Sequence, residues 1–169
     1  VTLGANPNYD VTAIDNTLTV NRKAATVAAN PKSKTYGEAN PVLDATVTGT
    51  VGAEVLDYSL ATTATQASGT AGYPITVTLG ANPNYSVKVP ADNGTLTIQR
   101  AIATVTANDK SKKYGEPIPA LNATVAGQVP GGDAINYALA TTATQLGNVS
   151  GSPYPITVTM GSNPNYSVT

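Results

Sequence analysis

Thr95-Leu-Thr-Ile-Gln-Arg-Ala-Ile-Ala-Thr-Val-Thr-Ala107 is an unbroken run that contains no glycine, proline or serine. Its first half places Leu96 and Ile98 between threonine and glutamine, and its second half places Val105 between two threonines. Alternation with a period of two is typical of antiparallel strands that are buried on one face. The run therefore predicts two strands that follow one another with almost no linker.

The same alternation occurs at other places in the chain. Ile75-Thr-Val-Thr-Leu79 and Ile156-Thr-Val-Thr-Met160 both carry apolar residues at every second position. Asn-Pro-Asn and Gly-Gly-Asp sequences, which favour turns, separate such stretches. Short strands separated by turns predict an all-β fold, in which tandem small β-sandwich domains, Ig-like or similar, form a rod-like array.

The chain repeats itself. The sequence Leu-Gly-Ala-Asn-Pro-Asn-Tyr ends at Tyr9 and again at Tyr85, and it returns with two changes ending at Tyr166. An interval of about 80 residues indicates a tandem array of small domains. We therefore divide the chain into three parts. Residues 1–22 are the C-terminal strands of a truncated preceding repeat, residues 23–100 are a complete β repeat, and residues 101–169 are a β repeat that lacks its last strand.

The junctions between the repeats predict stiffness. Flexible linkers are rich in glycine and serine, and semi-rigid spacers are often rich in proline. Neither residues 95–107 nor the corresponding residues 17–29 have such a composition. We expect neighbouring units to hold a fixed angle, so that the partners of each unit are neighbouring repeats of the same chain or identical chains.

The composition argues against several classes of function. The 169 residues include no His, Cys or Trp, 11% are charged, and the net charge is −1. This balance gives no electrostatic reason to expect a nucleic acid or an anionic membrane as a partner. No stretch is long and apolar enough to predict membrane insertion. Without His or Cys, and without a nucleophile elbow or a phosphate-binding loop, we expect neither an enzyme nor a bound cofactor.

Two short motifs recur in both repeats. Lys34-Thr-Tyr-Gly-Glu38 returns as Lys112-Lys-Tyr-Gly-Glu116, and Gly72-Tyr-Pro-Ile75 returns as Pro153-Tyr-Pro-Ile156. With the closing Asn-Pro-Asn-Tyr and Gly-Thr-Leu-Thr-Ile sequences, this order resembles the bacterial MBG domain of the YGX type, and the resemblance covers essentially the whole chain. It implies an extracellular or bacterial cell-surface protein of the adhesin-like kind, and it brings no catalytic residues.

A residue present in every copy is expected to build the copy, because a unique active site needs to exist only once. The repeat-signature residues are Tyr36, Gly37, Glu38, Tyr114, Gly115, Glu116, Tyr73, Tyr154, Tyr9, Tyr85 and Tyr166. We expect such tyrosines to bury their rings and to bond their hydroxyl groups to turns. The alternative is a multivalent glycan- or surface-binding module of an adhesin, in which tyrosines are stacking platforms.

Two kinds of site involve charged residues. Lys34 and Lys112 lie close in sequence to Glu38 and Glu116, which allows a speculative lysine–asparagine crosslink assisted by a buried carboxylate. We favour the simpler interpretation, a solvated charge pair beside a turn. The carboxylates match no calcium-binding loop, although the sequence leaves open a calcium ion at a domain junction.

The residues before the first complete repeat correspond to the end of a repeat. Asn16-Thr-Leu-Thr-Val-Asn-Arg22 matches residues 93–100, and residues 101–169 contain no such sequence. Either the chain is a segment of a longer array, which we favour, or separate molecules join head to tail into filaments by strand complementation. Under both interpretations we expect a structural repeat of an extracellular fibre or adhesin stalk.

Overall fold

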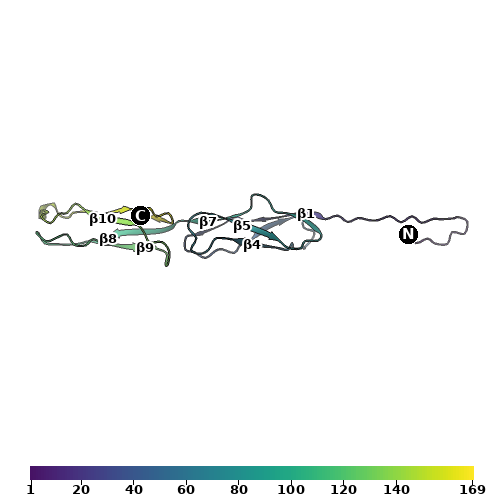
Figure 1. Ribbon diagram of the computed structural model, residues 1–169, viewed down its shortest axis with the longest axis horizontal. Helices are drawn as coiled ribbons and strands as arrows, with labels where there is room; N and C mark the ends of the chain where they lie inside the picture. The colour runs from purple at the N-terminus through teal and green to yellow at the C-terminus, as the bar shows by residue number, and fades with distance from the viewer.

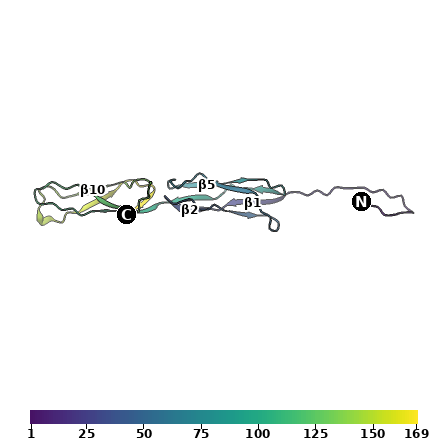
Figure 2. The ribbon, with the colours of Figure 1, turned by 90° about the horizontal axis from the view of Figure 1, so that it is seen from below.

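The computed structural model describes every residue from Val1 to Thr169. Two β domains lie end to end along one axis, and residues 1–22 extend away from the first domain at the end opposite the second (Figure 1, Figure 2). The structure has no α-helix, and therefore no helix with the length and apolar character that a bilayer crossing requires. The predicted all-β tandem architecture is confirmed.

The first domain is a sandwich of two sheets. Its strands are β1 (Lys23–Ala29), β2 (Lys32–Thr35), β3 (Ala45–Thr48), β4 (Tyr58–Thr62), β5 (Gly72–Leu79), β6 (Tyr85–Lys88) and β7 (Thr95–Gln99). One sheet has the order β3-β1-β6, and the other has the order β2-β7-β5-β4. β1 runs parallel to β6 and β2 runs parallel to β7, whereas the remaining pairs are antiparallel. Val27 of β1 packs in a core that Val77 of β5 joins from the other sheet.

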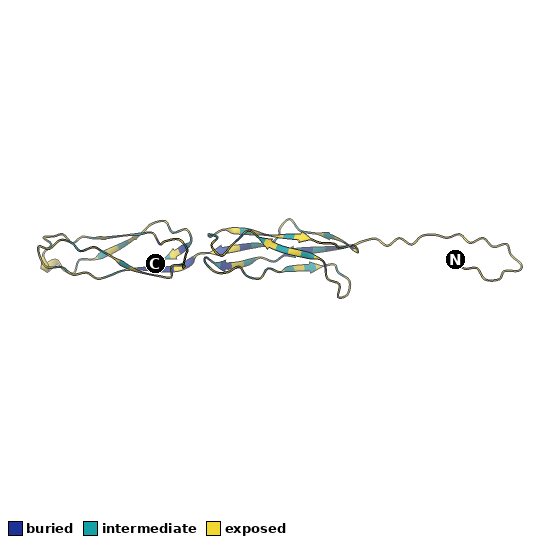
Figure 3. Cartoon of the chain, turned by 60° about the horizontal axis from the view of Figure 1, so that its bottom comes forward, coloured by how far each residue is buried: buried dark blue, intermediate teal, exposed yellow.

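The alternating pattern places apolar side chains in the interior of the first domain. In β7, Leu96 and Ile98 are 0% and 3% exposed, whereas Thr97 between them faces solvent. In β5, Ile75 is buried and Thr76 is exposed, and Figure 3 shows this alternation along the strands. Burial of a leucine or isoleucine side chain stabilises a domain by about 1.5–3 kcal/mol. The two inward residues of β7 therefore contribute substantially to the core.

The second domain has fewer strands. They are β8 (Ala101–Ala107), β9 (Ala123–Ala126), β10 (Tyr137–Thr141), β11 (Ile156–Met160) and β12 (Tyr166–Val168), with a short 3₁₀ turn at Val149–Gly151. The sheets are β12-β8-β9, which corresponds to β6-β1-β3, and β10-β11, which corresponds to β4-β5. Residues 110–113 align with β2 but form no strand, and no strand of this chain occupies the place of β7. Because β7 is the only neighbour of β2 in its sheet, residues 110–113 have no ladder partner.

Residues 1–22 also form no strand, although their sequence alternates. Leu18 and Val20, which align with Leu96 and Ile98, are 92% and 87% exposed. A strand is stable when it pairs with a neighbour and packs its apolar face on a core. The N-terminal segment has neither, because it lies away from both domains (Figure 1).

We predict that Leu96→Ala lowers the free energy of unfolding of the first domain by about 2–5 kcal/mol, because it leaves a cavity in place of a fully buried side chain. Thr97→Ala, on the solvent face of the same strand, is the matched control and should change this free energy by less than about 1 kcal/mol. Urea denaturation followed by circular dichroism measures both. Equal losses in the two variants would contradict the described packing of β7.

Candidate functional site

The junction between the two domains is built on a continuous core. β7 ends at Gln99, and β8 begins at Ala101, so Arg100 alone separates the last strand of one domain from the first strand of the next. Residues from both sides of this point belong to one hydrophobic cluster of 11 buried residues. Its members are Ala29, Tyr36, Ala64, Ile75, Leu96 and Ile98 of the first domain and Ala101, Ala103, Val105, Ile135 and Tyr166 of the second. The domains therefore share apolar burial rather than meeting as separate bodies.

The Tyr-Gly-Glu signature forms a tight turn at the end of β2. Glu38 N–H donates to the Thr35 carbonyl at 3.1 Å, and Gly37 has a φ of 87°. A positive φ at the third position of such a turn favours glycine, which explains the Gly of the signature. The Glu38 carboxylate accepts a hydrogen bond from Thr35 N–H at 2.7 Å and so closes the turn from the other side. This turn presents Tyr36 towards the second domain.

Tyr36 crosses the junction. Its side chain is 5% exposed, and its hydroxyl oxygen accepts a hydrogen bond from Asp133 N–H of the second domain at 3.1 Å. Its ring meets the ring of Tyr166 edge to face, with centroids 5.4 Å apart and planes at 83°. Tyr166 in turn donates to the Asp133 carbonyl at 3.0 Å and accepts from Val129 N–H at 3.2 Å. Edge-to-face aromatic pairs contribute about 0.5–1.5 kcal/mol beyond their burial.

Gly37 lies directly against the second domain. A Cβ atom at this position would stand 2.3 Å from the Cγ1 atom of Val129, so no side chain fits there unless Val129 or the backbone that carries it shifts. The equivalent Gly115 has nearly the same φ, 86°, but a Cβ atom there would meet nothing within 4 Å. The two glycines thus share a turn conformation, and Gly37 alone also has a packing role at the junction.

The Asn-Pro-Asn-Tyr sequence of the second domain forms the polar rim of the junction. Thr70 N–H donates to Asn165 Oδ1 at 2.7 Å, and Thr70 Oγ1 donates to the Pro164 carbonyl at 3.0 Å. Arg100 Nε donates to the same carbonyl at 3.1 Å. Asn165 Nδ2 donates to the Asp133 carboxylate at 2.7 Å, which holds the amide in place. These bonds fix the rotation of one domain relative to the other.

The structure places the remaining signature tyrosines within single domains or in solvent. The Tyr73 hydroxyl donates to the Gly69 carbonyl at 3.2 Å, and the Tyr154 hydroxyl donates to the Asn148 carbonyl at 3.0 Å. Tyr85 is buried, and its hydroxyl accepts from Val51 N–H and donates to the Glu54 carboxylate. That hydrogen bond to Glu54, with burial as the second cause, raises the pKa of Tyr85. Tyr9 and Tyr114 are largely exposed, and Tyr114 lies in the turn of residues 113–116.

The signature lysines bind carbonyl oxygens. Lys34 Nζ donates to the Glu38 and Thr65 carbonyls at 2.9 and 2.7 Å, and no asparagine side chain is among its hydrogen-bond partners. Burial lowers the pKa of Lys34, and the Glu38 carboxylate opposes this shift. Lys112 Nζ donates to the Gln145 carbonyl at 2.9 Å, one residue beyond the counterpart of Thr65, and Lys112 is less buried than Lys34. Glu116 closes its turn as Glu38 does, by accepting from Lys113 N–H at 2.8 Å.

Two structural features lay outside the sequence prediction. Gln66 Nε2 donates to the Gly37 carbonyl, and Gln145 Nε2 donates to the Gly115 carbonyl, both at 2.9 Å. The hexapeptide Ala-Thr-Thr-Ala-Thr-Gln, which ends at both glutamines, is the signal that could have revealed this support of the turn. No three His, Cys, Asp or Glu side chains come together in a group that could hold a metal ion.

The second feature is a charged cluster beside β1. Lys32 Nζ and Asn30 Nδ2 donate to the Asp44 carboxylate at 2.5 and 2.7 Å. The hydrogen bond from Lys32, and after it that from Asn30, lowers the pKa of Asp44. Asn122 takes the place of Asp44 in the second domain, where Asn108 Nδ2 donates to it at 3.2 Å. Only the first domain therefore carries an acid at this position.

These features define a tandem all-β repeat whose units are held end to end by a shared core. The family model described as MBG domain (YGX type) matches residues 25–97 and again residues 103–169, and the chain belongs to this family. The family is one of repeat domains and not a known enzyme family. Comparison with curated proteins and comparison with solved structures gave no significant match.

We predict that Gly37→Ala loosens the junction, whereas Gly115→Ala does not. Both substitutions place a side chain at a strained positive φ, so their shared cost of about 1 kcal/mol cancels in the comparison. Only the methyl group introduced at position 37 would meet Val129. Distances between spin labels on the two domains, measured by double electron–electron resonance, should broaden for Gly37→Ala alone. Equal distributions for both variants would contradict the packing role of Gly37.

The Asp44 cluster predicts a dependence of stability on pH. Because the folded pKa of Asp44 lies below its unfolded value of about 3.9, the ionised group stabilises the first domain above that value. This stabilisation is lost as the pH falls through the folded pKa. We expect Asp44→Asn, which copies the second domain, to reduce the fall in unfolding midpoint between about pH 5 and about pH 2. An unchanged pH profile in thermal melts would contradict this role of Asp44.

Proposed function

We propose that this chain is a structural repeat of a bacterial extracellular fibre or adhesin stalk. The shared core of the junction carries the proposal, because an array in which each unit packs on the next transmits orientation along its length. Such an array behaves as a stiff rod. In a filament, identical chains would join head to tail by strand complementation.

The direction of the strands suits a part that bears tension. The strands run along the long axis of both domains (Figure 1). A pull along this axis loads the pairing of β7 with β2 and with β5 in shear. Ladder hydrogen bonds lie across the strands, so a shearing load is shared by several bonds that must break together. This geometry favours mechanical resistance over a hinge.

An extracellular or cell-surface location is part of the proposal. Membership of the MBG family is compatible with an extracellular repeat module. The chain contains no cysteine, so a module of this kind would rest on its shared core and its junction hydrogen bonds rather than on disulfides. Multiplying the number of units would lengthen such a stalk without a change in the contact that joins them.

Electron microscopy of residues 1–169 tests the mechanical part of the proposal. We expect negative-stain class averages to show two domains at one fixed angle. A Gly-Ser-Gly-Ser insertion between Arg100 and Ala101 is the control, and it should spread the angles widely because it separates β7 from β8. A wide spread of angles in the unmodified chain would contradict a rod.

The location is tested on intact cells of the source organism. Antibodies raised against residues 23–169 should label the outer surface of cells that have not been permeabilised, and antibodies against a cytosolic protein should label only permeabilised cells. Labelling by both antibodies only after permeabilisation would overturn the extracellular assignment.

A further inference from the structure

The two domains differ in the length of one turn. Between β3 and β4 the first domain has the sequence Val51-Gly-Ala-Glu54, and between β9 and β10 the second domain has Val129-Pro-Gly-Gly-Asp133. Each turn begins three residues after its strand, and a buried residue, Leu56 or Ile135, lies two residues before the next strand. The second domain therefore carries one additional residue inside the turn.

The additional residue changes which amide group closes the turn. In the first domain, Glu54 N–H donates to the Val51 carbonyl at 3.2 Å. In the second domain, Gly132 N–H donates to the Val129 carbonyl at 3.0 Å. The acidic residue is thus the last residue of the shorter turn, whereas Asp133 follows the longer one. Because the closing bond takes up the amide group of Glu54, only the amide group of Asp133 is free for a partner outside the turn.

Proline and glycine set the shape of the longer turn. Pro130 is its second residue, and Gly131, with a φ of 71°, is its third. This arrangement is typical of a type II turn, in which proline presets the second position and a positive φ favours glycine at the third. In the shorter turn the positive φ, 57°, belongs to the second residue, Gly52. The two turns therefore differ in backbone conformation as well as in length.

Asp133 uses all its polar groups at the junction. Its N–H donates to the Tyr36 hydroxyl of the first domain at 3.1 Å, and its carbonyl accepts from the Tyr166 hydroxyl at 3.0 Å. Its carboxylate accepts from Asn165 Nδ2 at 2.7 Å, and Oδ1 of the same asparagine accepts from Thr70 N–H across the junction at 2.7 Å. One residue thereby connects the aromatic pair with the polar rim of the junction.

The acid of the shorter turn makes different contacts. The Tyr85 hydroxyl, which corresponds to that of Tyr166, donates to the Glu54 carboxylate rather than to a backbone carbonyl. Glu54 thus uses its amide group and its carboxylate within the first domain. The same two groups of Asp133 bind the Tyr36 hydroxyl and hold the amide of Asn165.

The space beside the Tyr36 hydroxyl is narrow. A Cβ atom at Gly132 would stand 3.0 Å from the hydroxyl oxygen of Tyr36 and 3.1 Å from that of Tyr166. Both separations are shorter than the optimum for atoms in van der Waals contact, so a side chain here would push the Tyr36 hydroxyl away from Asp133. In the shorter turn the residue before the acid is Ala53, which carries such a Cβ atom.

We infer that the turn of residues 129–133 is the part of the second domain that selects a Tyr-Gly-Glu turn as its neighbour. Its additional residue frees the Asp133 N–H to bind the tyrosine hydroxyl, and Gly132 leaves room for that hydroxyl. A domain with the shorter turn of residues 51–54 offers neither feature and does not bind a Tyr-Gly-Glu turn in this way. The length of the turn therefore decides which repeat can follow a Tyr-Gly-Glu turn along a rod. This inference rests on the proposed rod-like function and names the residues that set the order of its units.

Exchange of the two turns tests this inference in residues 1–169. In the short-turn variant, Val-Gly-Ala-Glu replaces residues 129–133, and in the control variant, Val-Pro-Gly-Gly-Asp replaces residues 51–54. Each turn already joins the equivalent strands in the other domain, so we expect both variants to fold. Amide hydrogen exchange of Thr70, whose N–H donates to Asn165 across the junction, reports whether the domains stay in contact.

We expect the Thr70 amide to exchange at least about tenfold faster in the short-turn variant, because the Tyr36 hydroxyl and the Asn165 amide lose their partners. The control variant should exchange at the rate of the unmodified chain. Gly132→Ala should give a smaller increase than the short turn, because it narrows the space for the hydroxyl but keeps the length of the turn.

Tyr36→Phe separates the proposed hydrogen bond from general damage to the turn. It removes the hydroxyl group and should speed the exchange of Thr70 in the unmodified chain. In the short-turn variant it should add nothing, because the bond is already absent there. Tyr114→Phe, in the equivalent turn of the second domain, is the matched control and should leave the exchange of Thr70 unchanged.

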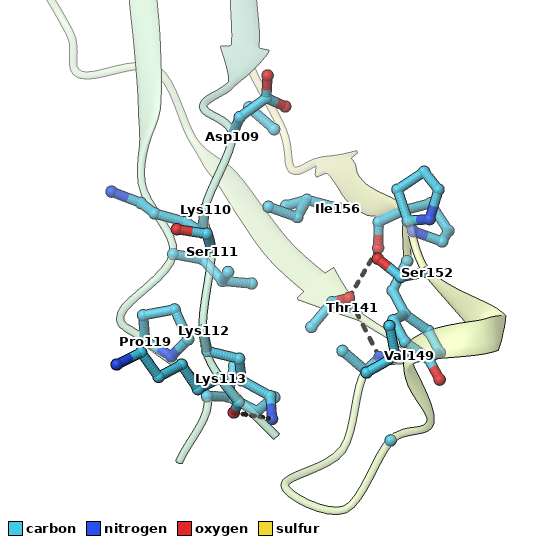
Figure 4. Close-up of a pocket in the computed structure, with 18 of the residues that line it drawn as sticks. Asp109, Lys110, Ser111, Lys112, Lys113, Pro119, Thr141, Val149, Ser152 and Ile156 are labelled. Atoms are coloured by element: carbon cyan, nitrogen blue, oxygen red, sulfur yellow. Dashed lines mark hydrogen bonds between the residues drawn. The ribbon is translucent and has the colours of Figure 1, made fainter. Parts of the chain in front are cut away.

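A hydrogen bond remote from the turn shows whether the second domain stays folded. Ala143 N–H donates to Thr141 Oγ1 at 3.2 Å, beside an open groove of about 800 Å³ that separates Thr141 from residues 110–113 (Figure 4). None of residues 129–133 lines this groove. The exchange of Ala143 should therefore be the same in all variants. If the short turn alters it, Gly132→Ala takes the place of the short-turn variant in the comparison with Tyr36→Phe.

The inference is overturned if the short-turn variant, or Gly132→Ala in its place, protects Thr70 as well as the unmodified chain does. It is also overturned if Tyr36→Phe speeds the exchange of Thr70 equally with either turn. Rapid exchange of Thr70 in the unmodified chain would mean that the two domains do not hold one another, and this result would count against the proposed rod itself.

Discussion

The structure depends on two consecutive strands, β7 and β8, that join the two domains through a single residue. β7 fills the core of the first domain with Leu96 and Ile98, and one residue later its chain becomes β8, the central strand of a sheet in the second domain. Because β7 is fixed in one domain and β8 in the next, the backbone has almost no conformational freedom at Arg100, which alone separates them. Tyr36, Gly37 and Asn165 then close the contact from the sides, with hydrogen bonds and van der Waals packing that suit one orientation.

The two domains also show how far a strand depends on its neighbours. Residues 110–113 have nearly the same sequence as β2, yet only β2 forms a strand, because only β2 has β7 beside it. The same holds for residues 17–21, which share the pattern of β7 but lack a partner and a core. Strand formation is decided by pairing and burial more than by local preference. Residues 110–113 and residues 17–21 thus form no strand for the same reason, which is that neither segment has a partner strand beside it.

Much of the fold could be predicted from local sequence. The alternation around Ile75 and Leu96 identified strands and their inward faces, and the absence of glycine and proline near Arg100 indicated a stiff junction. The parallel pairing of β1 with β6 and of β2 with β7 could not be predicted, because it joins residues that are far apart in sequence. The partner of the Tyr36 hydroxyl was unpredictable for the same reason. A bond to a turn was expected, but Asp133 belongs to a turn of the next domain. The purely structural role of the repeated signature residues stays a prediction.

Amide hydrogen exchange of residues 1–169 tests the central claim that β7 holds its domain together and couples it to the next. The account predicts strong protection of Ile98 and Tyr36, whose amide groups donate to the Ala71 and Gln99 carbonyls. It predicts exchange at least about a hundredfold faster for Tyr114, the counterpart of Tyr36, in the domain where the strand position is vacant. Equal protection of Tyr36 and Tyr114 would contradict the central claim. The amide group of Tyr36 would then be protected no better with β7 beside it than the amide group of Tyr114 is without such a strand.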